Sequence, residues 1–250
     1  MKKLIAANWK MNKTGAEAVS FLKEFKPLVK DANADIVVCP SFTSLQDAAK
    51  EAKGSNVHIG AQNMHFEDSG AFTGDISPLM LKDFCEYAII GHSERREFFK
   101  EDDQMINKKL ISALKHGFKA ILCVGETWEQ RSNNQTEDVL EDQLVKGLDG
   151  IKDTANLTVA YEPVWAISRG NPNQKAATKD DAEQAHVFIR KVLAGIFDED
   201  TAKKIRILYG GSMKPENAKE LLAMKNIDGG LVGNASLNAK SFAEVVKAAQ

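Results

Sequence analysis

The alternation of short apolar runs with longer amphipathic stretches constrains the fold of this chain more than any other feature. Each apolar run is short and aliphatic, which is typical of a strand buried on both faces. The stretches between them have helical spacing, and in the last one Phe242, Val245 and Val246 fall on one face. This alternation favours a parallel sheet covered by helices. The predicted strands are Leu4–Ala7, Ile36–Cys39, His58–Ala61, Tyr87–Ile90, Ala120–Val124, Leu157–Tyr161, Ile205–Tyr209 and Gly230–Val232. The clearest predicted helices are Ala16–Val29, Gln104–Lys115, Val139–Leu148, Asp181–Leu193 and Ser241–Ala249.

The number of repeats and the length of the chain together favour a closed (β/α)8 barrel. Eight strand–helix units in 250 residues match the size of this fold. An open, doubly wound sheet is the alternative, but neither GxGxxG after the first strand nor a Walker A lysine loop is present. No proline- or serine-rich linker divides the chain. We therefore expect one domain over residues 1–250.

Composition argues against several classes of partner. Acidic and basic residues nearly cancel (35 against 33, net charge −2), and no basic run is interleaved with aromatic residues. Nucleic-acid binding is therefore not expected. The apolar run near the start stops at Asn8, which is too early for a secretion signal, and no later run is long enough to span a bilayer. No membrane association is expected.

The three cysteines indicate a reducing compartment. Cys39, Cys85 and Cys123 are odd in number and widely separated, without CxxC spacing. Such cysteines are typical of small buried hydrophobic residues in a cytosolic protein. We therefore expect a cytoplasmic location.

Chemically useful residues follow several of the predicted strands. In a (β/α)8 barrel the active site lies at the carboxyl ends of the strands, so these residues should share one rim. Asn8 and Lys10 follow the first strand, His92 the fourth, and Glu162 the sixth. Taken singly, a solvated acid, a capping histidine or a surface lysine explains each equally well. Glycine-rich segments follow the seventh and eighth strands: Gly210-Gly211-Ser212 and Gly233-Asn234.

The sequence implies no metal and no cofactor. Its five histidines form neither HExxH nor any other paired spacing typical of metal ligands. A GxSxG elbow is also missing, and Cys123 at the end of the fifth strand is interpreted as a packing residue.

Five motifs, in order along the chain, resemble those of triosephosphate isomerases. Any one of them is weak, but five on eight strand–helix units are highly specific. The resemblance covers the whole chain and implies a closed (β/α)8 TIM barrel. The motifs are Ala7-Asn8-Trp9-Lys10-Met11-Asn12, Gly91-His92-Ser93-Glu94-Arg95-Arg96, Tyr161-Glu162-Pro163-Val164-Trp165-Ala166-Ile167, Tyr209-Gly210-Gly211-Ser212 and Gly229-Gly230-Leu231-Val232-Gly233.

This resemblance implies interconversion of D-glyceraldehyde 3-phosphate and dihydroxyacetone phosphate, an aldose–ketose isomerisation in glycolysis and gluconeogenesis. It assigns Glu162 as the base that moves a proton between two carbons through an enediolate. His92 is the neutral electrophile on the substrate oxygens, and Asn8 donates a hydrogen bond to them. Lys10 supplies positive charge, and Glu94 orients Lys10.

The resemblance also assigns the phosphate site and a lid. Ser212, Gly233 and Asn234 are the expected N–H donors to the phosphate, joined by Ser168 from a lid at residues 163–177. Two departures from the family pattern concern this site. Ser168 replaces a glycine in a lid that is longer than usual, and Asn234 replaces a second glycine.

The long connection at residues 62–77 is expected to dock on another surface, and the resemblance implies that this surface belongs to the second subunit of a homodimer. It holds Met64, Phe66 and Phe72, and so apolar a loop is costly as free coil. Family members insert the matching loop into a second subunit, which would bring Thr73 towards the partner's Asn8 and Lys10. The alternative is a loop folded back on its own barrel.

Two other functions remain as alternatives. A different phosphosugar barrel, such as an aldolase or epimerase, would need a Schiff-base lysine within a strand or paired metal ligands, and neither is seen. A non-catalytic phosphate binder has no use for a base, so Glu162 and His92 argue against it.

Overall fold

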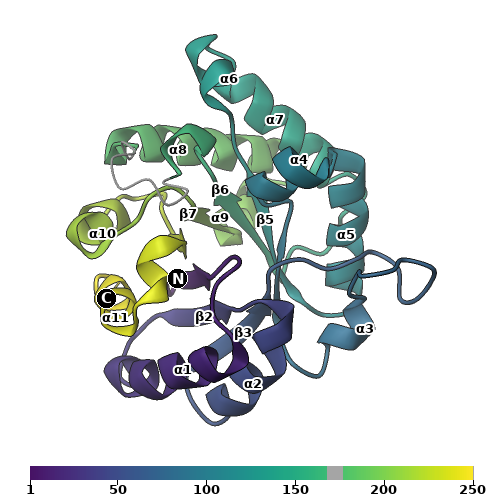
Figure 1. The fold of residues 1–250 in the computed structure, drawn as a ribbon. Helices are drawn as coiled ribbons and strands as arrows, with labels where there is room; N and C mark the ends of the chain where they lie inside the picture. The colour runs from purple at the N-terminus through teal and green to yellow at the C-terminus, as the bar shows by residue number, and fades with distance from the viewer. Residues whose placement is uncertain (168–176, 250) are drawn as a thin grey trace.

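Eight parallel strands close into a barrel in the computed structural model, which describes residues 1–167 and 177–249. The strands follow one another around the barrel in chain order, and the helices form a ring outside them (Figure 1). The predicted fold class is therefore confirmed. The strands are β1 (Leu4–Asn8), β2 (Asp35–Cys39), β3 (Val57–Ala61), β4 (Tyr87–Ile90), β5 (Lys119–Val124), β6 (Leu157–Tyr161), β7 (Arg206–Tyr209) and β8 (Gly229–Val232).

At least one helix follows every strand, and each of the clearest predicted helices corresponds to an observed one, although the predictions at Val139–Leu148 and Ser241–Ala249 end one and two residues too late. Three helices begin at capping boxes, in which a threonine and the third helical residue exchange hydrogen bonds, as Thr14 and Glu17 do. The helices are α1 (Gly15–Val29), α2 (Phe42–Ala52), α3 (Pro78–Leu81), α4 (Ser93–Phe99), α5 (Asp103–Lys115), α6 (Trp128–Ser132), α7 (Thr136–Gly147), α8 (Lys179–Ile196), α9 (Glu199–Lys204), α10 (Pro215–Leu222) and α11 (Ala239–Lys247), with 3-10 turns η1 (Val164–Ala166) and η2 (Asn234–Leu237).

The pairing of β1 with β8 closes the barrel. Leu4 lies opposite Gly229, and the register continues to Ala7 opposite Val232. Gly229 has a φ of +155°, and a Cβ atom there would lie 1.9 Å from the Leu4 carbonyl oxygen. Only glycine allows the two backbones to come this close. Closure leaves no strand with an unpaired edge.

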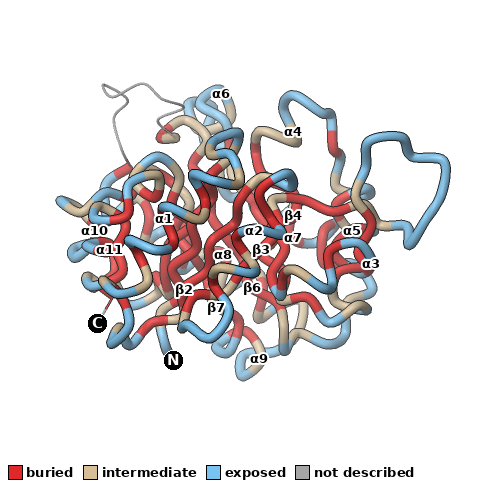
Figure 2. The backbone as a smooth tube through the Cα atoms, turned by 60° about the horizontal axis from the view of Figure 1, so that its bottom comes forward, coloured by how far each residue is buried: buried red, intermediate tan, exposed pale blue. Residues whose placement is uncertain are grey.

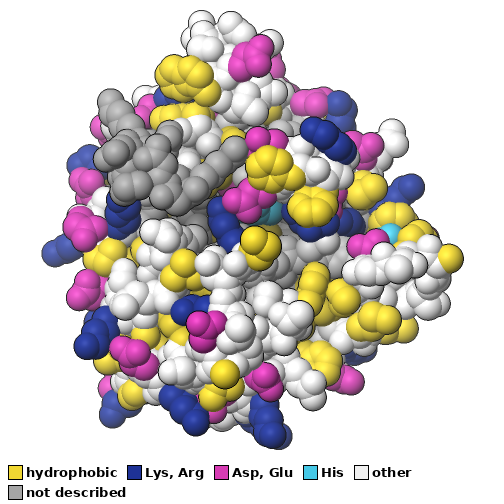
Figure 3. All heavy atoms as spheres, viewed as in Figure 1, with side chains coloured by type: hydrophobic (Ala, Val, Ile, Leu, Met, Phe, Trp, Pro, Cys, Tyr) yellow, Lys and Arg dark blue, Asp and Glu magenta, His cyan; other side chains and the backbone are white. Residues whose placement is uncertain are grey.

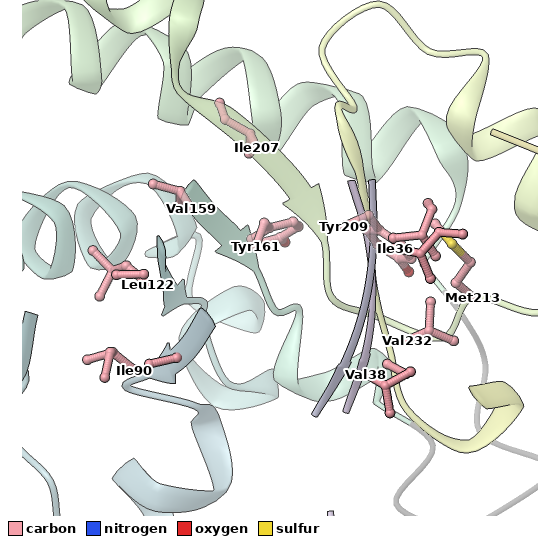
Figure 4. Packing of buried hydrophobic residues seen from close by; sticks show 14 of the residues in the cluster. Ile36, Val38, Ile90, Leu122, Val159, Tyr161, Ile207, Tyr209, Met213 and Val232 are labelled. Carbon is pink, nitrogen blue, oxygen red and sulfur yellow. The ribbon is translucent and has the colours of Figure 1, made fainter. Parts of the chain in front are cut away.

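Two apolar layers hold the barrel together. One fills its interior and includes Leu4, Ile89 and Leu208, all of which are buried. The other lies between the strands and the helices, and Figure 4 shows strand residues of this layer such as Leu122 and Val159. In Figure 2 the strands are buried along almost their whole length. Burial on both faces explains why the strand sequences are continuous apolar runs.

Within the described residues, no helix is long and apolar enough to cross a membrane.

A buried histidine links the stability of this core to pH. His186 on α8 is fully buried, and its Nδ1 lies 3.0 Å from the carbonyl oxygen of Asn226. Its Nε2 has no hydrogen-bond partner among the described residues. Burial lowers the pKa of His186 to about 3, with the positive charges of Arg190 and Lys3 acting in the same direction.

We expect the protein to lose stability in acid through His186. The unfolded chain takes up a proton near pH 6.5, whereas the folded chain resists it down to about pH 3. The stabilisation that comes from keeping His186 neutral is therefore fully present above pH 6.5. Between pH 6.5 and about pH 3, the free energy of unfolding should fall by up to about 1.4 kcal/mol per pH unit. Urea unfolding of wild type and His186→Gln at pH 7.5 and 5.5 measures this. His186→Gln should flatten the pH dependence, while His58→Gln, at a half-exposed histidine, should not.

Candidate active site

The carboxyl ends of the strands surround one cavity of about 490 Å³. Histidine, acidic and basic side chains gather near the centre of this face of the molecule (Figure 3). The cavity brings together residues that follow five strands. Those predicted from the sequence that line it are Asn8, Lys10, His92, Glu162, Ser212, Gly233 and Asn234.

Glu162 stands directly after β6, with its side chain almost wholly buried. Its backbone N–H donates to the carbonyl of Val124 on β5 at 2.7 Å, which continues the strand pairing beyond β6. One carboxylate oxygen accepts the Ser93 N–H at 2.8 Å, and the other lies 2.9 Å from Nε2 of His92. Each carboxylate oxygen thus faces a donor of the protein. To reach a ligand, the carboxylate must break at least one of these two contacts.

His92 is fixed as a neutral ring by its place at the start of α4. It is the residue before the first turn, and its Nδ1 accepts the backbone N–H of Glu94 at 3.2 Å. A nitrogen that accepts a hydrogen bond carries no proton, so the proton of the ring lies on Nε2. That N–H points at Glu162. The arrangement places a neutral N–H donor, rather than a cation, beside the carboxylate.

The surroundings of Glu162 balance burial against nearby donors. Burial is the largest influence and raises its pKa, but His92, the Ser93 N–H and the charge of Lys10 together bring the pKa below its usual value. Glu162 is therefore an anion at neutral pH. An ionised, buried carboxylate gains basicity when a ligand displaces its donors, because it then loses the groups that stabilise its charge.

Lys10 adopts a backbone conformation that is rare for a residue with a side chain. Its φ is +52°, and the side-chain oxygen of Asn8 accepts its N–H at 3.0 Å. The amide of Gln62 donates to the Lys10 carbonyl at 2.9 Å and to that of Cys39 at 2.9 Å. The ammonium lies 2.6 Å from Glu94. These contacts hold the charge of Lys10 at the rim of the cavity.

The loops after β7 and β8 present backbone groups to the cavity. Asn217 braces the first loop, since its side chain donates to the Ser212 carbonyl and accepts the Lys214 N–H, at 3.0 and 2.7 Å. Ser236 braces the second, donating to the carbonyl of Gly233 at 2.6 Å, while the Trp9 indole donates to the Ser236 carbonyl at 3.1 Å. Sequence analysis missed both supports, because they depend on contacts formed only in the fold.

Sequence analysis also missed the buried carboxylate of Glu126. Glu126 is wholly buried and accepts hydrogen bonds from the Tyr161 hydroxyl and, at 2.8 Å, from the Trp165 indole. Arg131 stacks on the Trp165 ring and pairs with Asp181 at 2.6 Å. No sequence motif marks this network, whose members come from three separate segments.

The described residues contain no group of three or more histidine, cysteine or acidic side chains that could hold a metal ion. Burial, followed by the charge of Glu162, raises the pKa of Cys123 well above its usual value. The thiol stays protonated and packs in the barrel interior. Ser168, the other predicted phosphate donor, lies outside the described residues.

Comparison with known proteins identifies the family. A family model for triosephosphate isomerase matches residues 3–249. The chain belongs to the triosephosphate isomerase family. A triosephosphate isomerase from Clostridium novyi (strain NT) is 49% identical over 248 residues, which cover 98% of each chain. Another, from Dictyoglomus turgidum (strain DSM 6724 / Z-1310), is 50% identical over 250 residues, 98% of this chain and 99% of the relative. The crystal structure of triosephosphate isomerase from Bartonella henselae matches with a TM-score of 0.90 at 39% identity, covering 99% of both chains.

Membership of the triosephosphate isomerase family confirms the predicted activity. The chain is an isomerase that interconverts D-glyceraldehyde 3-phosphate and dihydroxyacetone phosphate, a reaction of glycolysis.

Proposed function

We propose that Glu162 and His92 carry out the proton transfers of this isomerisation. The observation that supports the proposal is the placement of a buried, ionised carboxylate 2.9 Å from a neutral imidazole N–H, over one cavity. A base and an electrophile side by side suit proton abstraction next to a carbonyl group.

In this mechanism Glu162 turns from the Ser93 N–H towards the bound triose phosphate. It takes a proton from one carbon, the electron pair moves to the carbonyl oxygen, and an enediolate forms. His92 Nε2–H stabilises the negative oxygen, and the Asn8 amide donates a second hydrogen bond. His92 gives its Nε2 proton to the negative oxygen and takes the proton of the hydroxyl group on the deprotonated carbon. The carbonyl then forms at that carbon, while Glu162 returns its proton to the former carbonyl carbon, so the base and the imidazole are both regenerated.

The remaining site residues supply charge and backbone donors. Lys10 attracts the phosphate and offsets the charge of the enediolate, and Glu94 holds the ammonium in place. The phosphate binds to the backbone N–H groups of Ser212, Gly233 and Asn234, in loops held by Asn217 and Ser236.

Residues 163–177 form the lid in this proposal, with Ser168 as a donor to the phosphate. Arg131 braces both sides of this segment, because it stacks on Trp165 in its first part and pairs with Asp181 on the helix that follows it. Closing the lid excludes water and keeps the enediolate from losing phosphate.

A homodimer is the proposed assembly. Large apolar side chains are exposed along one side of the face shown in Figure 3, which suits an interface. Residues 67–75 are exposed as an arm, whose base is built by stacking of the His65 ring on Phe66 and Phe72. A preformed arm loses little conformational entropy on binding. The interface patch comprises Met11, Phe72, Leu79, Met80, Phe98 and Phe99.

The patch borders a second cavity, of about 480 Å³, that reaches the catalytic residues. Asn8, Lys10 and Phe98 are among its lining residues. We place Thr73 of the partner subunit's arm in this cavity, where it approaches Asn8 and Lys10. The cytoplasm is the proposed location, because all three cysteines are free and buried as apolar residues.

A coupled assay with D-glyceraldehyde 3-phosphate tests these roles against the alternatives. Wild type should consume it with no metal or carbonyl partner. A requirement for a second carbonyl substrate would indicate an aldolase, and binding without turnover would indicate a phosphate binder.

Shortening the base should separate catalysis from binding. Glu162→Asp draws the carboxylate back by about one C–C bond, and a displacement of about 1 Å costs on the order of a hundredfold in kcat. KM should change little, since the phosphate donors remain. Steady-state kinetics measure both, with Glu216→Asp as control at a carboxylate that lines the same cavity. Near-normal turnover in Glu162→Asp would exclude Glu162 as the base.

Lys10→Met should impair both binding and turnover. The charge of Lys10 meets the phosphate in the bound substrate and the enediolate in the transition state, so KM rises and kcat falls by on the order of tenfold or more each. If Lys10→Met had the KM and kcat of wild type, the proposed role of Lys10 in binding and catalysis would be wrong.

The arm should determine assembly. Thr73→Arg brings a second cation against the partner's Lys10, and we expect the dimer dissociation constant to rise on the order of a hundredfold. Sedimentation velocity over a dilution series measures this, with Val187→Arg as control at an exposed apolar residue outside the patch. A wild-type monomer at micromolar concentration contradicts the dimer.

A further inference from the structure

The last residue of the segment Gly91-His92-Ser93-Glu94-Arg95-Arg96 has no part in the mechanism above, yet its side chain makes three hydrogen bonds. The guanidinium of Arg96 donates to the Gly91 carbonyl at 2.9 Å and to the Cys123 carbonyl at 3.1 Å. A third contact joins it to Asp103 at the start of α5, at 2.6 Å. Only 17% of the side chain is exposed.

These contacts lie where β4 and β5 stop pairing. The last paired residues of the two strands are Ile90 and Leu122. Gly91 and Cys123 come next, and the guanidinium bridges their carbonyls in place of the missing ladder. A planar fork of N–H donors can satisfy several acceptors in fixed directions, which a lysine ammonium cannot do.

The bridged carbonyl belongs to the peptide that leads into His92. Gly91 has a φ of +72°, where a side chain is disfavoured, and a Cβ atom would lie 3.1 Å from Ile106. Because glycine can adopt many backbone conformations, the Gly91–His92 peptide needs other contacts to hold it in this one orientation. The Arg96 side chain holds the Gly91 carbonyl, and the backbone N–H of Arg96 donates to the His92 carbonyl at 3.1 Å.

The other bridged carbonyl leads towards the base. Val124, next to Cys123, accepts the Glu162 N–H at 2.7 Å. Arg96, Cys123, Ser93 and Glu162 also line one cavity of about 270 Å³ behind the catalytic carboxylate. One guanidinium is thus tied to the end of β4, which leads into His92, and to the end of β5, whose Val124 carbonyl accepts the N–H of Glu162. His92 and Glu162 are the partners of the 2.9 Å contact.

We propose that Arg96 is a positioning residue, which sets the placement of the His92 imidazole relative to Glu162. The inference rests on the proposed roles of those two residues. Arg96 touches no substrate, so its loss should affect the transition state, where alignment matters, more than binding. In the described structure its three hydrogen bonds go to Gly91, Asp103 and Cys123, and not to the proposed phosphate loops after β7 and β8.

The main test is Arg96→Lys, which keeps a cation beside Asp103 but not the fork. We expect kcat to fall on the order of tenfold to a hundredfold with KM within a fewfold. Asp103→Asn is the matched control, because it removes the ion pair and leaves both carbonyl bonds. It should keep kcat within about twofold.

A double-mutant cycle with His92→Gln decides whether Arg96 acts through the imidazole. If it does, Arg96→Lys should slow His92→Gln far less than it slows wild type. The proposal would be overturned if the fold-losses in kcat of the two single variants multiplied in the double variant. A wild-type kcat in Arg96→Lys would also overturn it. A His92→Gln variant as fast as wild type would instead contradict the proposed mechanism, so the two failures are distinguishable.

Chemical rescue keeps the test decisive if Arg96→Lys is poorly folded. Millimolar guanidinium added to Arg96→Ala should raise kcat at nearly constant KM, whereas ammonium should not. A rise in the thermal midpoint of unfolding with guanidinium, without any rise in kcat, would show a purely structural role and contradict the proposal.

Discussion

Closure of the barrel through β1 and β8 is the constraint on which the rest of the structure depends. Once Leu4 pairs with Gly229, every strand has two neighbours, and all eight carboxyl ends face the same side. Residues far apart in sequence then reach one cavity without any local signal that relates them. The close approach of β1 and β8 requires glycine at position 229, because a Cβ atom there would overlap the Leu4 carbonyl. Two apolar layers, inside and outside the strands, stabilise the closed form.

The electrostatic character of the site follows from that geometry. Burial alone would make Glu162 a poor anion, but the Ser93 N–H and the His92 N–H compensate for the lost water. The start of α4 settles the tautomer of His92, since the Glu94 N–H occupies Nδ1 and leaves the proton on Nε2. The ionised Glu162 carboxylate therefore accepts a hydrogen bond from a neutral His92 ring, and the two groups lie 2.9 Å apart. The same helix start thus orients the His92 ring and, through the Ser93 N–H, holds the Glu162 carboxylate.

Arginine side chains connect the strand ends where main-chain pairing has stopped. Arg96 bridges the ends of β4 and β5, and Arg131 connects the segments on either side of residues 168–176 through Trp165 and Asp181. Loops that carry function need such support, because they lack the ladder that fixes the strands. Backbone carbonyls are the natural targets, and the guanidinium reaches several of them from one position.

The sequence by itself determined the architecture and the location of the chemistry. Buried parallel strands must be apolar on both faces and helices apolar on one, so the alternating pattern predicted strands, helices and barrel, and strand ends predicted where Asn8, Lys10, His92 and Glu162 lie. The motifs at those ends predicted the family. Only the tertiary structure decided the contacts among them: the Ser93 N–H on the Glu162 carboxylate, the left-handed backbone of Lys10, the buried Glu126, and the bridge made by Arg96. These arise from atoms that are distant along the chain, and no local pattern encodes a distance between two strands, because that distance is set by the packing of the whole barrel.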